Sequence, residues 1–289
     1  MKIINSLVKK MLTAPLAYSI VRSTGLFQNK RIRRAVWLPE FIKVKDSQVM
    51  LKSDTRISKI ADLHFLGWKN LKDYFSLTIL RKLATTSQVI FDVGADTGMV
   101  SLYISEANPA ARIYSFEPSR HSYPVLLTNL QKNNNQMITP NKMAVGAKNS
   151  TETFYYSPAN SVISSLEPRE GFEAEDVRVT TIETFCGQNK INKIDLIKID
   201  VEGFEGDVIA GLGEEIALSR PIIHAEVLNE TNGAKIGPVL PTDYVYFRIN
   251  DEKQLLQKDV KIDRTSIVSN NYLFVPQEKL SLLKELLIA

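Results

Sequence analysis

Hydrophobic and polar residues alternate in blocks along most of the chain, and the order of the blocks predicts an α/β protein. Five short apolar runs have the length of buried strands: residues 89–93, 112–116, 141–145, 194–199 and 222–227. Three intervening segments have the spacing of helices: residues 99–106, 123–133 and 205–217. Because strands separated by helices pair in parallel through right-handed crossovers, the pattern predicts a doubly wound, mostly parallel, Rossmann-like sheet.

The two ends of the chain depart from this alternation. Residues 244–249 and 272–275 predict two further strands with no helix between them, which indicates an antiparallel finish to the sheet. Residues 41–53 predict a short hairpin, and residues 63–83 are mostly helical in pattern. We therefore expect three parts, which are a basic amphipathic arm (1–40), a hairpin and helix packed on the core (41–86) and the catalytic domain (87–289).

The first part of the chain is strongly basic. Residues 1–45 hold ten Lys and Arg against one acid, whereas the whole chain has a net charge of only +4. Apolar residues at positions 3, 4, 7, 8, 11 and 12 predict an amphipathic helix that Pro15 breaks or kinks. The longest uncharged run, residues 11–21, is shorter than the about 20 residues of a spanning helix. Two interpretations remain, attachment of residues 1–34 to an anionic membrane surface or a helix packed on the fold.

Composition excludes several classes of protein. A hydrophobic content of 44% is too high for a disordered chain. One Cys and three His argue against a disulfide framework, a Cys-rich metal site and a multi-histidine centre.

We expect a cytoplasmic protein, with the inner face of a membrane as an alternative location. The basic arm lacks interleaved aromatic residues, so a nucleic-acid partner is not expected. The oligomeric state cannot be read from the sequence.

A glycine-containing turn follows the first predicted strand. It reads Asp92-Val-Gly94-Ala-Asp96-Thr-Gly98, and glycine permits backbone conformations and close approaches that a side chain blocks. The dinucleotide pattern G-x-G-x-x-G is not met, because Asp96 and Met99 stand where two of its glycines belong. A carboxylate at position 96 would also repel a pyrophosphate. The turn therefore disfavours a nicotinamide dehydrogenase, and no Gly-Lys-Ser/Thr follows to form a P-loop.

An acid stands at the end of the next strand. Glu117 lies 23 residues after Gly94, where a carboxylate accepts hydrogen bonds from the ribose hydroxyls of a nucleoside. A glycine turn unsuited to pyrophosphate and a ribose-binding acid together favour a nucleoside ligand without phosphates. S-adenosylmethionine is the leading candidate, with its cationic groups near Asp92 and Asp96.

Several segments resemble the FkbM-type S-adenosylmethionine-dependent methyltransferases. They are VIFDVGADTG (89–98), YSFEP (114–118), VRVTTIETF (177–185), IDLIKIDVEGFEGDVIAG (194–211) and PIIHAEV (221–227). The resemblance implies a class I methyltransferase whose cofactor site comprises Asp92, Gly94, Asp96, Gly98, Glu117 and Ala144. Asp96 replaces the Asn usual in the family, and Ile182-Glu183 replaces Leu-Asp. The first 40 residues have no counterpart in it.

Two acids end the strand predicted over residues 194–199. Alternation along an extended segment puts Lys198, Asp200 and Glu202 on one side, and Gly203 lets the chain turn into the next helix. A hydroxyl acceptor must lose its proton as it attacks a methyl group, so a positioned base is expected. Asp200 is our first candidate and Glu202 the second.

The following strand supplies possible partners for this base, His224 and Glu226. Lys198 and His224 have two interpretations, a catalytic role or burial against a neighbouring carboxylate. A divalent metal is not expected; if one binds, its ligands would be Asp200, Glu202 and Glu226.

The predicted function is O-methylation of a sugar, glycan or secondary metabolite with S-adenosylmethionine. One alternative is a non-catalytic module that binds this cofactor. Another is a nucleic-acid methyltransferase that uses the basic arm, which the Asp-Val-Glu-Gly sequence at the strand end disfavours. The polar segment 160–175 is expected to form a loop over the acceptor pocket, with an ordinary exposed connection as the alternative.

Overall fold

The computed structural model describes residues 15–30, 32, 36–53, 59–156, 164–165, 170–228, 230–259, 262 and 270–286. The chain forms two compact units, Met1–Tyr74 and Phe75–Ala289. The helix expected over residues 3–12 lies outside the described residues. Whether residues 1–40 form a separate arm stays a prediction. Within the described part of the chain, no helix is both long and apolar enough to cross a membrane.

The first unit contains a hairpin and short helices. Its elements are α2 (Pro15–Thr24), η1 (Leu26–Gln28), β1 (Phe41–Lys43), β2 (Met50–Lys52), α4 (Ile60–Leu66) and η2 (Trp68–Asn70). The predicted hairpin is confirmed, since β1 and β2 pair antiparallel. Gly67 interrupts the helix predicted over residues 63–83: it has a φ of 78°, and a Cβ there would lie 2.8 Å from Lys45 O. Val21 of α2 packs in a small core with Val36 and Phe65.

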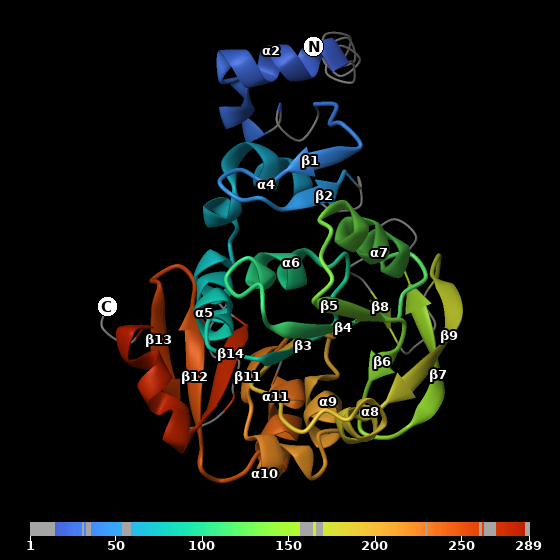
Figure 1. Ribbon diagram of the computed structural model, residues 1–289, viewed down its shortest axis with the longest axis vertical. Helices are drawn as coiled ribbons and strands as arrows, with labels where there is room; N and C mark the ends of the chain where they lie inside the picture. The colour runs from blue at the N-terminus through green and yellow to red at the C-terminus, as the bar shows by residue number, and fades with distance from the viewer. Residues whose placement is uncertain are drawn as a thin grey trace. The chain divides into compact units, whose positions relative to one another are not determined.

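The second unit is built on an eight-stranded sheet, with the strand order β13-β12-β14-β11-β10-β3-β4-β5 (Figure 1). The strands are β3 (Val89–Val93), β4 (Arg112–Phe116), β5 (Ile138–Asn141), β10 (Leu196–Ile199), β11 (Ile222–Glu226), β12 (Tyr244–Asn250), β13 (Leu255–Asp259) and β14 (Asn271–Pro276). Five neighbouring strands, from β11 to β5, pair in parallel. Strand β14 is antiparallel to both β11 and β12, which confirms the antiparallel finish.

Helices cover both faces of this sheet. They are α5 (Tyr74–Ala84), α6 (Met99–Ser105), α7 (Tyr123–Lys132), α8 (Ile182–Asn189), α9 (Glu205–Ala210), α10 (Glu215–Ser219) and α11 (Glu230–Ile236). In Figure 1 α5, α6 and α7 lie on one face, and α8, α9 and α11 on the other. From β3 the chain continues to β4 and β5 on one side and later to β10 and β11 on the other. The strand order therefore reverses between β3 and β10, where α/β sheets bind ligands.

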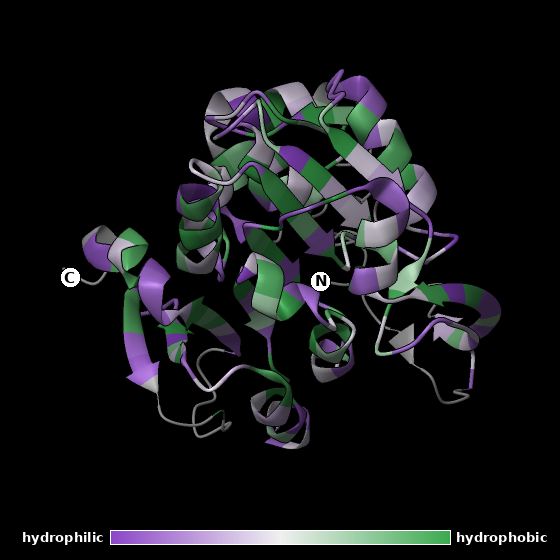
Figure 2. Ribbon diagram, turned by 60° about the horizontal axis from the view of Figure 1, so that its bottom comes forward, coloured by the Kyte–Doolittle hydropathy of each residue, from purple (hydrophilic) through white to green (hydrophobic). Residues whose placement is uncertain are grey.

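The two faces of the sheet differ in polarity because side chains alternate along each strand. Phe91, Ile197 and Ile223 point to the face covered by α8 and α9 and belong to the main apolar core. Asp92, Lys198 and His224 point to the opposite face and pair in register across β3, β10 and β11. Figure 2 shows hydrophobic residues along the central strands and hydrophilic residues in many of the loops. Three charged or titratable side chains are thus buried within one layer of the fold.

A second sheet is inserted between β5 and β10. Its order is β6 (Ala144–Val145), β9 (Glu173–Thr180), β7 (Ser150–Tyr156) and β8 (Ser164–Ser165). Three of our expectations are corrected by the structure. The strand predicted over residues 141–145 is divided between β5 and β6, which belong to different sheets. Residues 173–175 of the predicted loop 160–175 lie in β9. The helix predicted over residues 205–217 is divided into α9 and α10, since Gly213 has a φ of 53°.

Candidate functional site

The glycine turn after β3 brings three strand ends together. The backbone N–H groups of Gly94 and Ala95 both donate to Phe116 O of β4, each at 3.0 Å. On the other side, a Cβ on Gly94 would lie 1.8 Å from Asp200 O, which follows β10. Gly94 also has a φ of 75°, a conformation that residues with side chains rarely adopt. The close approach of β3 to β10 therefore requires glycine at this position.

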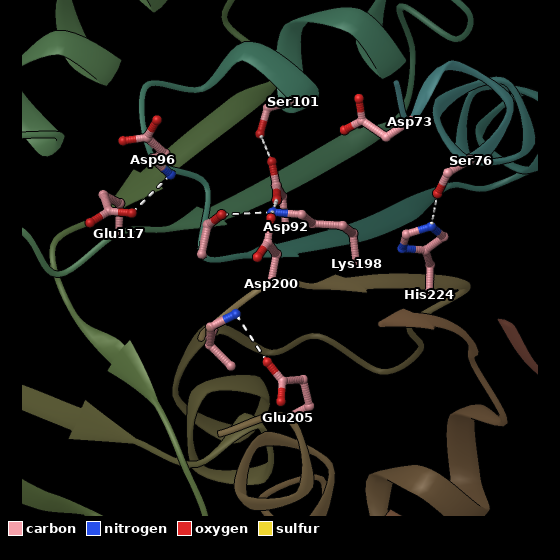
Figure 3. A network of polar contacts seen from close by, with 12 residues as sticks. Asp73, Ser76, Asp92, Asp96, Ser101, Glu117, Lys198, Asp200, Glu205 and His224 are labelled. Atoms are coloured by element: carbon pink, nitrogen blue, oxygen red, sulfur yellow. Dashed lines mark hydrogen bonds and ion pairs between the residues drawn. The ribbon is translucent and has the colours of Figure 1, made fainter. Parts of the chain in front are cut away.

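Glu117 and Asp96 connect the end of β4 to the glycine turn. Glu117 is 8% exposed. Its Oε2 accepts from Asp96 N at 2.8 Å (Figure 3). Its Oε1 accepts from Ser119 N at 2.8 Å. Asp96 Oδ1 in turn accepts from Ser122 Oγ at 2.6 Å. The two sequence motifs expected to bind one nucleoside are therefore in direct contact.

Burial controls the protonation of both acids. It raises the pKa of Glu117 to about 8, with the charge of Asp96 as the next contribution. Burial also raises the pKa of Asp96. A carboxylate oxygen accepts more than one hydrogen bond, and each oxygen of Glu117 holds one backbone N–H. Glu117 therefore keeps acceptor capacity that fits the two hydroxyls of a ribose.

Ala144, the remaining predicted cofactor residue, lies in the second sheet. It is 9% exposed and packs with Val177 and Val179 of β9, and Phe154 of β7 lies against them. The structure thus places an apolar wall there, whereas the other predicted cofactor residues lie at or near the ends of β3 and β4.

A buried row of polar side chains crosses the sheet beneath α5 and α6. This inner polar row consists of Ser115, Asp92, Lys198 and His224. Lys198 Nζ lies 3.1 Å from Asp92 Oδ1 and donates to Gly94 O at 2.6 Å. Ser101 Oγ of α6 donates to Asp92 Oδ2 at 2.5 Å. Burial alone would lower the pKa of Lys198, but the charges of Asp92 and Asp200 outweigh it and raise that pKa.

His224 ends this row on the side of α5. It is 5% exposed, and its Nε2 lies 2.5 Å from Ser76 Oγ. Figure 3 shows the imidazole turned toward Ser76 and away from Asp200. Of the two interpretations that the sequence left open, this arrangement favours burial for both Lys198 and His224, with a serine as the contact of the histidine.

A second set of acids lies one step further along the strands. We call Glu117, Asp200, Glu202 and Glu226 the strand-end carboxylates. Asp200 follows β10 beside Glu226, the last residue of β11, because Ile199 pairs with Ala225. The Asp200 side chain is 44% exposed, and its Oδ2 lies 3.8 Å from Lys198 Nζ. Asp200 is therefore reachable from solvent, and Glu202 and Glu226 are partly exposed, whereas Glu117 is buried like the inner polar row.

Charge repulsion and burial affect two of these acids. Burial raises the pKa of Glu226 to about 8, and the adjacent Asp200 adds to the effect through its charge and a side-chain hydrogen bond. Burial likewise raises the pKa of Glu202 to about 7, with the charge of Asp200 as the next contribution. Glu202 and Glu226 thus hold protons near neutral pH that isolated carboxylates would lose.

The sharp turn after β10 fixes the direction of this acidic segment. Glu202 has a φ of 55° and Gly203 a φ of 109°, where a Cβ would lie 2.8 Å from Asn232 Nδ2. Glu205, which is fully buried, stabilises the turn: its Oε1 accepts from Gly203 N at 3.0 Å and Val201 N at 3.4 Å. This structural role of Glu205 was not predicted from the sequence. Its signal was an acid inside an otherwise apolar and small-residue stretch.

If a divalent metal bound, its expected ligands would be Asp200, Glu202 and Glu226. Among the described residues, no three His, Cys, Asp or Glu side chains are arranged to hold a metal ion. The arrangement therefore gives these acids no support as a metal centre.

Comparisons with known proteins show the family of this chain. Residues 92–250 match the methyltransferase FkbM domain family, over more than half of the chain. The chain is similar to methyltransferase sdnD of Sordaria araneosa, with 31% identity over an alignment of 159 residues; the match covers 44% of this chain and 61% of that protein. It is 26% identical to methyltransferase 1 of Beauveria bassiana over 44% of this chain and 59% of that one. The chain thus spans about three fifths of each of these two relatives.

A solved structure is also similar. The crystal structure of methyltransferase FkbM from Methylobacillus flagellatus KT has a TM-score of 0.44 and 16% sequence identity. The alignment covers 89% of this chain and 60% of that protein.

Proposed function

Because the chain belongs to the FkbM methyltransferase family, we propose that it transfers a methyl group from S-adenosylmethionine to a hydroxyl of a sugar, glycan or secondary metabolite. The observation that carries this proposal is the 2.8 Å hydrogen bond from Asp96 N to Glu117 Oε2. It joins the glycine turn and the buried acid at one place, beside the reversal of the strand order.

In this proposal the cofactor lies along the ends of β3 and β4. Glu117 accepts hydrogen bonds from the ribose hydroxyls, and Gly94 lets the backbone approach. Asp96 provides negative charge for a cationic ligand, and Ala144 an apolar surface. S-adenosylmethionine supplies an electrophilic methyl group on a positively charged sulfur.

Asp200 is the proposed general base. Its half-exposed carboxylate would take the proton of the acceptor hydroxyl as the oxygen forms its new bond to the methyl carbon; the bond from that carbon to sulfur would break, and S-adenosylhomocysteine would leave with the electron pair. Glu226 beside it shares that proton before solvent removes it. Lys198 keeps a positive charge 3.8 Å from Asp200 Oδ2, and Glu202 lies on the same turn. Lys198 acts in this proposal by positioning, since its own contacts are with Asp92 and Gly94.

Calorimetry with the purified chain tests the cofactor. We expect S-adenosylmethionine and its product S-adenosylhomocysteine to bind and NAD not to bind. Binding of NAD alone would contradict the proposal.

Mass spectrometry of glycans and metabolites from cells that lack the protein tests the acceptor. We expect at least one species to lose the mass of a CH₂ group for each missing methyl. Cofactor binding with no methyl group missing anywhere would favour the non-catalytic module.

Substitution then tests the base. With the acceptor in hand, Asp200→Asn should lower kcat about 10²- to 10⁴-fold while cofactor affinity is retained. Asp207→Asn is the matched control, because that acid is 41% exposed and lies in the following helix. An unchanged kcat in both Asp200→Asn and Glu202→Gln would contradict a strand-end base.

We also propose that the first unit binds an anionic membrane surface. Among the described residues of this unit, three large apolar side chains are exposed, Ile20 (47%), Leu26 (45%) and Trp37 (37%). Arg22 and Lys30 lie in the same part of the chain, which has a large excess of basic residues. Exposed apolar groups with basic neighbours have the chemistry of a surface that inserts among acidic lipids.

Vesicle sedimentation tests this second proposal. The full chain should pellet with vesicles containing phosphatidylserine and stay in solution with phosphatidylcholine alone. The double variant Ile20→Ser and Leu26→Ser should pellet less, whereas Leu218→Ser, an exposed leucine of the second unit, should behave like the wild type. Equal pelleting of all proteins, or no pelleting of the wild type, would contradict the proposal.

A further inference from the structure

Tyr156 is a buried residue to which the proposed reaction assigns no role. It ends β7 in the second sheet, and its side chain is only 4% exposed. Its hydroxyl is buried and has no hydrogen-bond partner among the described residues. Leaving a hydroxyl buried and unpaired costs free energy, and native proteins rarely keep such a group without use.

The register of the second sheet shows which way Tyr156 faces. Tyr156 pairs with Glu173 and Phe154 pairs with Glu175 across β7 and β9. Directly paired residues of an antiparallel sheet project to the same face, so these four side chains share one face. The rings of Phe154 and Tyr156 stack at an interplanar angle of 17°. This face continues into the apolar wall that includes Ala144.

Ion pairs and hydrogen bonds tie this face to the loop that holds Glu117. Arg120 N donates to Glu175 Oε2 at 2.9 Å, and the Arg120 guanidinium contacts Glu173. Arg120 comes directly after Ser119, whose N–H donates to Glu117 Oε1. The loop after β4 is therefore attached at one end to the predicted ribose acid and at the other to the strand paired with Tyr156.

Electrostatics indicate that the phenol and the ribose acid are neighbours. Burial raises the pKa of Tyr156 far above its usual value, and the charge of Glu117 is the next contribution. Tyr156 is therefore a neutral hydrogen-bond donor at any working pH. Glu117, with both oxygens already accepting N–H groups, acts as an acceptor.

We propose that the Tyr156 hydroxyl donates a hydrogen bond to the oxygen of a ribose hydroxyl of the nucleoside. The same ribose hydroxyl donates its own hydrogen bond to Glu117. A hydroxyl donates one hydrogen bond and accepts others, so one ribose hydroxyl satisfies both residues at once. The inference rests on the proposed function, because it takes the ligand to be a nucleoside. It adds the second sheet to the cofactor site and names Tyr156 as a further binding residue.

Calorimetry with ligand analogues tests this contact directly. The variants are Tyr156→Phe and the control Tyr155→Phe, whose side chain projects to the other face of the same strand. The ligands are S-adenosylhomocysteine and its 2′-deoxy and 3′-deoxy analogues. Tyr156→Phe should weaken binding of the parent ligand about 3- to 10-fold and leave binding of one deoxy analogue unchanged from the wild type. Tyr155→Phe should bind all three ligands as the wild type does.

Thermal unfolding separates this role from simple packing. Without ligand, Tyr156→Phe should be at least as stable as the wild type, because it removes an unpaired buried hydroxyl and keeps the stacked ring. Saturating S-adenosylhomocysteine should stabilise the wild type more than the variant. If the wild type binds and Tyr156→Phe has equal affinity for the parent ligand, the inference is overturned. The same follows if Tyr156→Phe loses the same affinity for all three ligands. If the wild type binds none of them, the proposed function itself fails.

Discussion

The inner polar row and the strand-end carboxylates lie on the same strands but compensate their charges differently. In the inner row, the buried charges of Asp92 and Lys198 lie 3.1 Å apart, and serine hydroxyls occupy further positions. At the strand ends, Asp200 has one cation at 3.8 Å, and Glu226 meets another acid. The inner row is buried and its charges are paired, while the strand-end set has more acids than cations and, apart from Glu117, is more accessible.

This difference indicates separate roles for the two sets. Buried charges are tolerated when they are paired, so the inner polar row holds β3 and β10 in place. Acids that stay protonated near neutral pH because of burial and repulsion are frequent at functional sites. Lys198 contacts both sets and is the element through which a change in one would reach the other.

Breaking the inner row should have the largest effect. Lys198→Met leaves the fully buried Asp92 without its cation, which should cost about 3–5 kcal/mol of unfolding free energy. Urea unfolding measures it. Lys193→Met is the control, because Lys193 is 64% exposed in its pair with Asp195 and should change stability by less than about 1 kcal/mol. Equal stability of the two variants would show that the inner row is not structural.

The sequence predicted most of the strands that carry the two sets of residues, and the exceptions have physical causes. Strands β3, β4, β10 and β11 were found because their apolar runs are buried on both faces. The junction after β5 was missed because two short strands of different sheets lie only two residues apart. Periodicity along one strand does not reveal which sheet a strand joins.

Some residues of the site were located from the sequence, and others were not. Glu117 and Gly94 follow strand ends, and the rule that ligands bind there located them. Lys198 and His224 lie on the same polar side of the sheet as Asp200, but both are buried while the Asp200 side chain is 44% exposed, a difference that alternation along a strand does not reveal. Tyr156 had no local signal at all, since its position depends on the long-range pairing of β7 with β9.

Cofactor binding should depend on pH through the strand-end set. The pKa of Glu117 is raised to about 8, and an ionised carboxylate accepts hydrogen bonds better than a protonated one. The affinity for S-adenosylhomocysteine should therefore rise with pH up to about 8, by at most about tenfold per pH unit, and then level off. Calorimetry between pH 6 and 9 measures this. In Glu117→Gln the rise should disappear; a rise that persists would assign the titration to another group.

Loss of the histidine contact in the inner row should have a smaller effect. Ser76→Ala removes the hydroxyl that lies 2.5 Å from His224 Nε2 and should cost about 1–3 kcal/mol of unfolding free energy. Thr85→Ala, at an exposed threonine that follows the same helix, should change stability by less than about 0.5 kcal/mol. The pH profile of methyl transfer should be the same in both variants. A pH profile that shifts in Ser76→Ala alone would indicate a catalytic role for His224.

The smallest expected effect has the opposite sign, because neutralising a strand-end acid should stabilise the free protein. The pKa of Glu226 rises from 4.5 to about 8 on folding, so the unfolded chain releases this proton first as pH increases. The contribution of Glu226 to the free energy of unfolding is most favourable below pH 4.5 and is lost as pH rises to about 8. Glu226→Gln should match the wild type at pH 5 and exceed it by about 1 kcal/mol at pH 8.5. Urea unfolding at both pH values, with the exposed Glu230→Gln as control, checks the sign. A loss of stability at pH 8.5 would mean that Glu226 is held as an anion, and the contrast between the two sets would fail.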